Sequence, residues 1–236
     1  MNGHARIRYR FDLPNGTKKT LDFFFDPVSF TLTNPPPSPP PFWTELGFNQ
    51  CANCPLNAAV VRHCPAALQM VRGIDELKDL VSHDTVTATV VQEERRVSVV
   101  TSAQNALASV FGLIMATSGC PWTDHLRPMA RFHLPFASEA ETVYRSLSMY
   151  ALAQVAWGRN SGSASFDGLR EIYAQLHSVN RGMSRRLGAA AQTDPARNAM
   201  ALLDAFAALL PDVMDKSLQE FEPLFSAWQL GQKRSI

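Results

Sequence analysis

The first part of the chain alternates apolar and charged residues. Every second residue from Ile7 to Leu13 is apolar, and arginine or aspartate stands at the positions between them. A period of two is typical of a half-buried β-strand, because successive side chains point to opposite faces of the sheet. Residues 14–16 (PNG) are a turn signal, and Thr20–Phe25 alternates again. The pattern predicts an antiparallel hairpin, followed by a third short strand at Ser29–Thr33.

A second pair of strand-like segments lies in the middle of the chain. Val86–Val91 and Arg95–Val100 are rich in valine and threonine, and Gln92–Glu94 separates them. We expect this second hairpin to join the same sheet as the first.

A proline-rich segment, residues 34–41 (NPPPSPPP), follows the first hairpin. Proline fixes φ and lacks an N–H group, so this segment excludes both a helix and a central strand and predicts an extended polyproline II connector. The expected organisation is an N-terminal hairpin region (1–33), the connector and a body (42–236). A single domain is the alternative if both hairpins share one sheet.

Capping patterns mark two longer helices. Residues 101–104 (TSAQ) form a capping box that predicts a helix ending at Gly119, where a left-handed residue fits. Residues 138–141 (SEAE) form a second capping box and predict a helix to about Trp157. The segment between these helices, Trp122–Ala137, is interpreted as an irregular loop.

Other helices are predicted from apolar periodicity and from the placement of proline. They are expected at Asn57–His63, from Pro65–Arg72 onward, from Ser165 or Asp167 to about Leu187, from Asp194-Pro195, and from Asp212 to Leu230, with a Gly/Ser loop at Arg159–Ser165. Strands and helices together predict an α+β fold, in which an N-terminal antiparallel sheet of hairpins accompanies a mainly α-helical C-terminal body.

Composition narrows the class of protein. With 46% apolar and 18% charged residues the chain is an ordinary globular protein, and its net charge of +1 gives no overall attraction to nucleic acid. Arg6, Arg8 and Arg10 are therefore interpreted as the solvated face of the first hairpin. Because neither an apolar signal segment nor a membrane-length apolar run appears, we expect a cytoplasmic protein with no membrane or nucleic-acid partner.

The four cysteines are the strongest chemical signal. Cys51, Cys54 and Cys64 lie within 14 residues of one another, and Cys120 follows in a similar Cys-Pro setting. In the cytoplasm a C-x2-C pair is more often a metal or redox site than a disulfide. The spacing predicts that these four thiolates bind one metal centre.

Four interpretations of the cysteines remain open: unrelated buried thiols, a C-x2-C redox pair, a zinc site and an iron–sulfur cluster. Proline directly follows Cys54, Cys64 and Cys120, as is typical of ferredoxin-type [4Fe–4S] segments. This favours a [4Fe–4S] cluster for electron transfer or redox sensing, with a redox protein as partner. The alternative is a structural Zn²⁺ in a non-enzymatic module for protein interaction or assembly.

Histidine can replace one sulfur in a zinc site. His63 adjoins Cys64, while His125 and His133 follow Cys120 at distances that a loop can fold back. All three are therefore alternative metal ligands.

The segment after Cys120 holds the candidates for further chemistry. Arg127, Arg131 and His133 precede the helix predicted to begin at Ser138, whose free N–H groups favour an anion. Two arginines can clamp a small anionic ligand, and a histidine can transfer a proton near neutral pH.

Glu141, Tyr144 and Arg145 lie one turn apart on the same predicted helix and can face the same pocket. The structural alternative is that the arginines pair with Glu139 and Glu141, or with carboxylates elsewhere, and only hold the loop in place. Both interpretations leave open whether the protein is an enzyme.

These motifs also resemble a known family. The string CxxCPL, HCP, TSxQ, SGCP, RPMARFHLPFA and ETxYRSxSMY, from about Leu46 to Asp204, is similar to bacterial proteins of the domain of unknown function DUF6901. The resemblance implies a bacterial source and groups the four cysteines with Arg127–Phe136 as one signature. It implies no particular activity.

Overall fold

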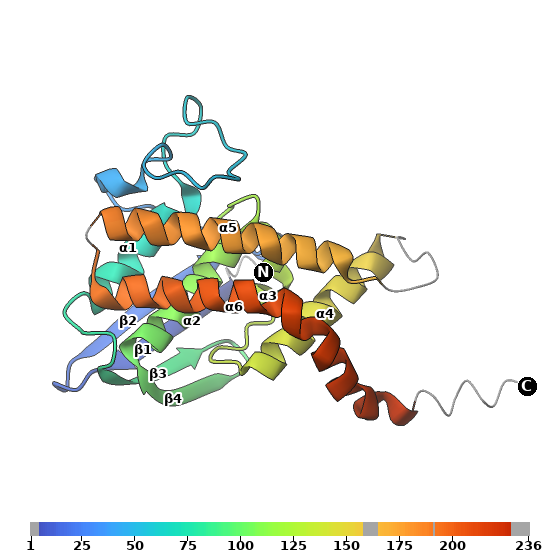
Figure 1. Cartoon of the computed structure of the whole chain (residues 1–236). Helices are drawn as coiled ribbons and strands as arrows, with labels where there is room; N and C mark the ends of the chain where they lie inside the picture. Colours follow the sequence, from blue (N-terminus) through green and yellow to red (C-terminus); the bar gives the residue numbers. More distant parts are fainter. Residues whose placement is uncertain (1–4, 158–164, 191, 228–236) are drawn as a thin grey trace, which may run out of the picture.

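The computed structural model of the chain describes residues 5–157, 165–190 and 192–227. Its main elements form three layers: an antiparallel sheet, two helices that cover one face of it, and an antiparallel pair of long helices outside them (Figure 1). This arrangement confirms the α+β fold. The predicted Gly/Ser loop at 159–165 lies almost wholly outside the described residues.

Both predicted hairpins are present in one sheet. β1 (Ala5–Asp12) and β2 (Lys18–Phe25) form the first, and β3 (Thr85–Val91) and β4 (Arg96–Ser102) form the second. β1 also pairs with β3, which gives the strand order β2-β1-β3-β4 with every neighbour antiparallel.

The sheet has one apolar and one polar face, as the alternation predicted. On its apolar face Val97 and Val99 of the edge strand β4 are half-buried, and the side chains of the other strands are buried: Ile7, Tyr9, Phe11, Leu21, Phe23, Phe25, Val86, Ala88 and Val90. On the other face Arg6 and Arg8 both donate to Asp22, at 2.9 and 2.7 Å. The arginine row is thus the outer side of a half-buried sheet.

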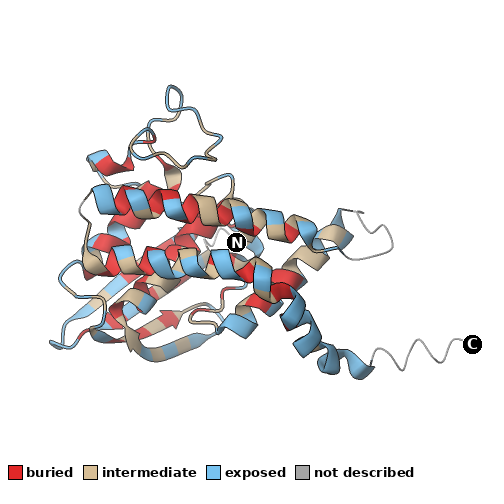
Figure 2. Cartoon of the chain, in the orientation of Figure 1, coloured by how far each residue is buried: buried red, intermediate tan, exposed pale blue. Residues whose placement is uncertain are grey.

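Two helices cover the apolar face. α1 (Pro65–Leu77) begins with proline in its first turn, and α2 (Ala103–Thr117) is buried on nearly every side (Figure 2). The Ser102 hydroxyl caps α2 by accepting from the Asn105 N–H group. The predicted cap, Thr101, is wrong because that residue still pairs with β3. Gly119, at φ +85°, ends the helix as expected.

Three longer helices complete the body: α4 (Glu139–Ala156), α5 (Asp167–Ala189) and α6 (Asp194–Phe221). Ser138 and Glu141 form the predicted capping box of α4. The separate helix predicted from Asp212 is wrong, because α6 continues through Pro211 and bends in its second half (Figure 1). No described helix is both long and apolar enough to cross a membrane.

Three shorter segments differ from the predictions. Residues 29–33 form only an isolated bridge from Leu32 to Phe25, because the chain turns through Phe30 at φ +54°. Residues 57–63 form no helix but a turn at 58–60 and an isolated bridge from His63 to Glu45. The Asn57 side chain accepts from the Ala59 N–H group, and the alanines beside it are exposed.

The predicted irregular loop at 122–137 instead contains the short helices η2 (Thr123–Leu126) and α3 (Arg127–Arg131). A further short helix, η1 (Phe42–Thr44), follows the proline connector, and η3 (Glu222–Phe225) follows α6.

The alternation of β2 can be tested with two neighbouring phenylalanines. Phe23 is 2% exposed in the core, whereas Phe24 is 37% exposed on the outer face. Phe23→Ala should lower the free energy of unfolding by about 3–5 kcal/mol, because it leaves a cavity. Phe24→Ala should cost less than about 1 kcal/mol. Urea denaturation of both variants measures the difference, and equal losses would contradict this register.

Candidate metal centre

The four cysteines come together from three parts of the chain. Cys51 and Cys54 lie in the loop after η1, Cys64 stands directly before α1, and Cys120 follows the end of α2. All four line one small pocket with an apolar wall of Leu56, Ala66, Trp122, Val179 and Met183. The four cysteines singled out in the sequence thus border one space.

The loop that carries Cys51 and Cys54 is bonded to α5. The Cys51 thiol donates to the Val179 carbonyl (3.6 Å), and the Asn53 amide donates to the Gln175 side-chain oxygen (2.8 Å). The Trp122 indole donates to the Asn53 carbonyl (2.6 Å), which links the loop to the segment of Cys120. The two halves of the pocket are thus held against each other by hydrogen bonds.

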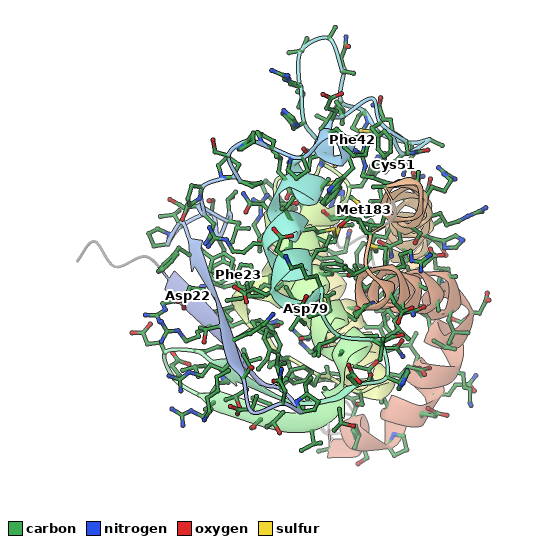
Figure 3. All side chains as sticks on the ribbon, turned by 90° about the vertical axis from the view of Figure 1, so that its left-hand side faces the viewer. Asp22, Phe23, Phe42, Cys51, Asp79 and Met183 are labelled. Atoms are coloured by element: carbon green, nitrogen blue, oxygen red, sulfur yellow. The ribbon has the colours of Figure 1, made fainter. Side chains whose placement is uncertain are left out.

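Close packing also requires glycine at position 182 on α5. A Cβ atom there would lie 2.5 Å from the Cys51 sulfur and 2.9 Å from its Cα atom. Figure 3 shows Cys51 beside Met183, where the cysteine loop meets α5. Only a residue without a side chain lets the loop approach the helix this closely.

A buried arginine stands next to the sulfurs. The Arg186 guanidinium is 1% exposed and donates to the backbone carbonyls of Trp43 (2.6 Å), Glu45 (2.6 Å) and Leu46 (3.1 Å). Its Nε atom is buried without a hydrogen-bond partner. Among the described residues no carboxylate forms an ion pair with it.

Burial and neighbouring charges shift the pKa values of Arg186, Cys51 and Cys64. Burial lowers the pKa of the Arg186 guanidinium, whereas the sulfurs of Cys64, Cys51 and Cys54 raise it. Burial, followed by the neighbouring cysteines, raises the pKa of the Cys51 thiol to about 12. Burial likewise raises the pKa of Cys64, although the N–H groups at the start of α1 act against it. Without a metal these thiols are therefore protonated at neutral pH.

The cysteines share a pocket but do not form a finished ligand set. The space among them is about 20 Å³, little more than one water-sized sphere. Within residues 5–157, 165–190 and 192–227, no group of three or more His, Cys, Asp or Glu is arranged to hold a metal ion.

None of the three candidate histidines lines the sulfur pocket. The ring of His63 bonds the Thr44 hydroxyl at 2.9 Å, and His125 is exposed. His133 is buried, and its Nε2 atom lies 2.7 Å from the Tyr9 hydroxyl. Burial, with a smaller contribution from Arg145, lowers the pKa of His133 to about 3.

The two arginines expected to clamp an anion lie apart from His133. Arg127 pairs with Asp124, and Arg131 lies over the rings of Phe30 and Phe132 on the surface. Neither pairs with Glu139 or Glu141 among the described residues; Arg127 instead pairs with a carboxylate of its own segment, as the structural alternative allowed, while Arg131 stacks on aromatic rings.

The α4 candidates divide in a similar way. Glu141 is exposed and caps its own helix; its hydrogen bonds with Ser138 lower its pKa. Tyr144 packs edge-on against Phe221. Only Arg145 combines with His133, since both line a larger cavity on the far side of the 122–126 segment.

Arg186 was not among the predicted site residues, although the sequence contains a signal for it. It lies three residues after Met183 and seven after Val179, on the stripe of α5 that is apolar elsewhere. A charged residue on such a stripe is exceptional unless it has a partner.

One family model, "Domain of unknown function (DUF6901)", matches residues 7–226. The match confirms the resemblance seen in the motifs and extends it to the N-terminal sheet. No curated protein and no solved structure matches the chain.

Two glycines of α5 provide a test of the close approach. Gly182→Ala should lower the free energy of unfolding by about 1–3 kcal/mol, because the new methyl group displaces Cys51. Gly188→Ala is the control: nothing lies within 4 Å of its Cβ position, so it should be neutral or stabilising by up to about 1 kcal/mol. Thermal and urea unfolding compare the two, and equal effects would contradict the contact.

His133 should make stability depend on pH. Below about pH 6.5 an unfolded histidine binds a proton, whereas folded His133 stays neutral down to about pH 3. Stability should therefore fall as the pH drops from 6.5 towards 3, with a slope of up to about 1.4 kcal/mol per pH unit from this group.

The unfolding free energy of His133→Gln, measured between pH 4 and 7, should depend less steeply on pH than that of the unmodified protein. His125→Gln, an exposed residue of the same segment, should leave it unchanged. An unaltered slope in His133→Gln would show that the histidine is protonated when folded.

Proposed function

The chain belongs to the DUF6901 family, and we propose that Cys51, Cys54, Cys64 and Cys120 together bind one metal centre of the [4Fe–4S] type. Such a centre would serve electron transfer or redox sensing. The family description names no activity, so the proposal rests on the chemistry of the sulfur pocket.

The buried charge of Arg186 is the observation that carries this proposal. An arginine remains protonated in a protein, and a buried cation without an anion is costly. Four thiolates around an iron–sulfur core or a zinc ion remain a net anion, and they would lie where the pKa of Arg186 already responds to sulfur. The metal centre thus supplies the negative charge that no described carboxylate provides.

The surroundings of the sulfurs favour a cluster. Proline after Cys54, Cys64 and Cys120 removes N–H donors, and the pocket wall is apolar. Cys51, Cys54 and Cys120 are half-buried. A centre near the surface can exchange electrons with a redox partner.

Zinc is the second candidate, because one observation favours it. The space among the sulfurs is about 20 Å³, which suits a single ion better than a cluster of several atoms. A four-cysteine zinc site would be structural, with no open position for catalysis, and the protein would be a module for interaction or assembly.

Either metal would change the state of the thiols. The ligands must be deprotonated, so binding would release protons from groups whose pKa is raised by burial. The N–H groups of Ala66 and Ala67 at the start of α1 favour the thiolate form of Cys64.

Anaerobic purification with metal and sulfide analysis tests the proposal. A brown protein with about four irons per chain is expected for one four-cysteine cluster. A colourless protein with about one zinc per chain would establish the second candidate. A protein that binds neither metal, even after anaerobic reconstitution, would contradict a metal centre.

Arg186→Met measured in the same experiment tests the charge argument. Removing a buried positive charge should make the reduction potential of a cluster more negative, while Arg186→Lys should restore part of the shift. Arg185→Met is the matched control, since Arg185 is the exposed neighbour on the same helix.

A further inference from the structure

A second and larger cavity lies between the outer helices and the core. Its volume is about 570 Å³, within the range of sites that bind drug-sized molecules. α2, α4, α5 and α6 form its walls, β4 contributes at one side, and residues 126–137 border it. None of the four cysteines lines it, so it is separate from the sulfur pocket.

Most of the cavity wall is apolar. The large apolar side chains of the wall include Leu113, Leu126, Met129, Leu176, Leu202 and Phe206. An apolar molecule in this concave space would bury much of its surface against the wall and make dispersion contacts with it.

One cation faces this apolar space. Arg145 is half-buried, and one of its terminal nitrogens donates to the carbonyls of Met129 (2.7 Å) and Phe132 (3.0 Å). Across the described ranges its other nitrogens have no hydrogen-bond partner, and it forms no ion pair. The guanidinium is therefore held in place with donors to spare.

The other polar groups of the wall carry no compensating charge. His133 is bonded to Tyr9 and neutral, and the Tyr173 hydroxyl lies 2.7 Å from Ser146. The Asn180 amide donates to the Leu203 carbonyl (3.0 Å). No carboxylate lines the cavity in the described part of the chain, and the carboxylate that acts on the Arg145 charge is the exposed Glu141, one turn earlier on α4.

We propose that this cavity binds an apolar molecule that carries one anionic group. The anionic group lies at Arg145 and accepts hydrogen bonds from its unused N–H groups. The apolar part lies among α2, α5 and α6. A guanidinium forms paired hydrogen bonds with a carboxylate. The inference is independent of the metal centre, because the two sites share no lining residue.

Calorimetric titration of the full chain with decanoate and with decanol tests the inference. Decanoate should bind, and decanol should bind about 10- to 100-fold more weakly, because it lacks the charge-assisted hydrogen bonds to Arg145. Arg145→Met should weaken decanoate by a similar factor and leave decanol unchanged. Arg131→Met, a surface arginine outside the cavity, should leave both unchanged.

A cavity-filling variant keeps the test valid if Arg145→Met fails to fold. A Cβ atom on Gly112 of α2 would meet only Leu203, at 4.0 Å, so Gly112→Leu should fold and occupy part of the space. It should weaken decanoate and decanol together, by at least about 10-fold.

Three results would overturn the inference: no binding of decanoate, equal affinities for decanoate and decanol, or unchanged decanoate binding in a folded Arg145→Met. Metal content is measured on the same samples, so a failure of the ligand-binding inference is distinguished from a failure of the metal-centre proposal.

Discussion

The cysteine region depends on the hydrogen bonds of one buried guanidinium. Residues 45–63 contain neither a helix nor a strand of their own, and only some of their backbone groups bond within the segment, as between Leu46 and Arg62. Arg186 binds three carbonyls at the start of this loop, those of Trp43, Glu45 and Leu46, from the side of α5. An arginine suits this task because its donors are planar and fixed in direction. The same group places a positive charge beside the sulfurs. One residue therefore both holds the loop and influences the electrostatics of the pocket.

α2 borders both the large cavity and, beyond its C-terminus, the sulfur pocket. One side of this helix packs on the sheet, and the other contributes to the large cavity with α5 and α6. Beyond its C-terminus, Gly119 turns the chain so that Cys120 joins the sulfur pocket. α5 serves both regions, since Leu176 lines the cavity while Val179 and Met183 line the pocket.

The fold was largely predictable because its signals are local. Alternation gave the faces of β1 and β2, and capping residues gave the start of α4 within one residue. Asn57–His63 failed because alanine content indicates a helix only where a surface exists to pack against. The cysteine spacing indicated the pocket, but Arg127 and Arg131 were assigned to a site by sequence proximity alone. Arg145 was among the α4 candidates, but Arg186 was not predicted, because its role depends on a helix that approaches the cysteine loop from a distant part of the chain.

The contact between Arg186 and Trp43 joins residues 143 positions apart. Cys51, Cys54 and Cys64 all precede α5 in the chain, so a ribosome synthesises them well before the helix that holds their loop. Domains fold as units once their sequence has emerged. During synthesis the three early cysteines therefore precede the helix that holds their loop, and the pocket can close only after Arg186 has also been made.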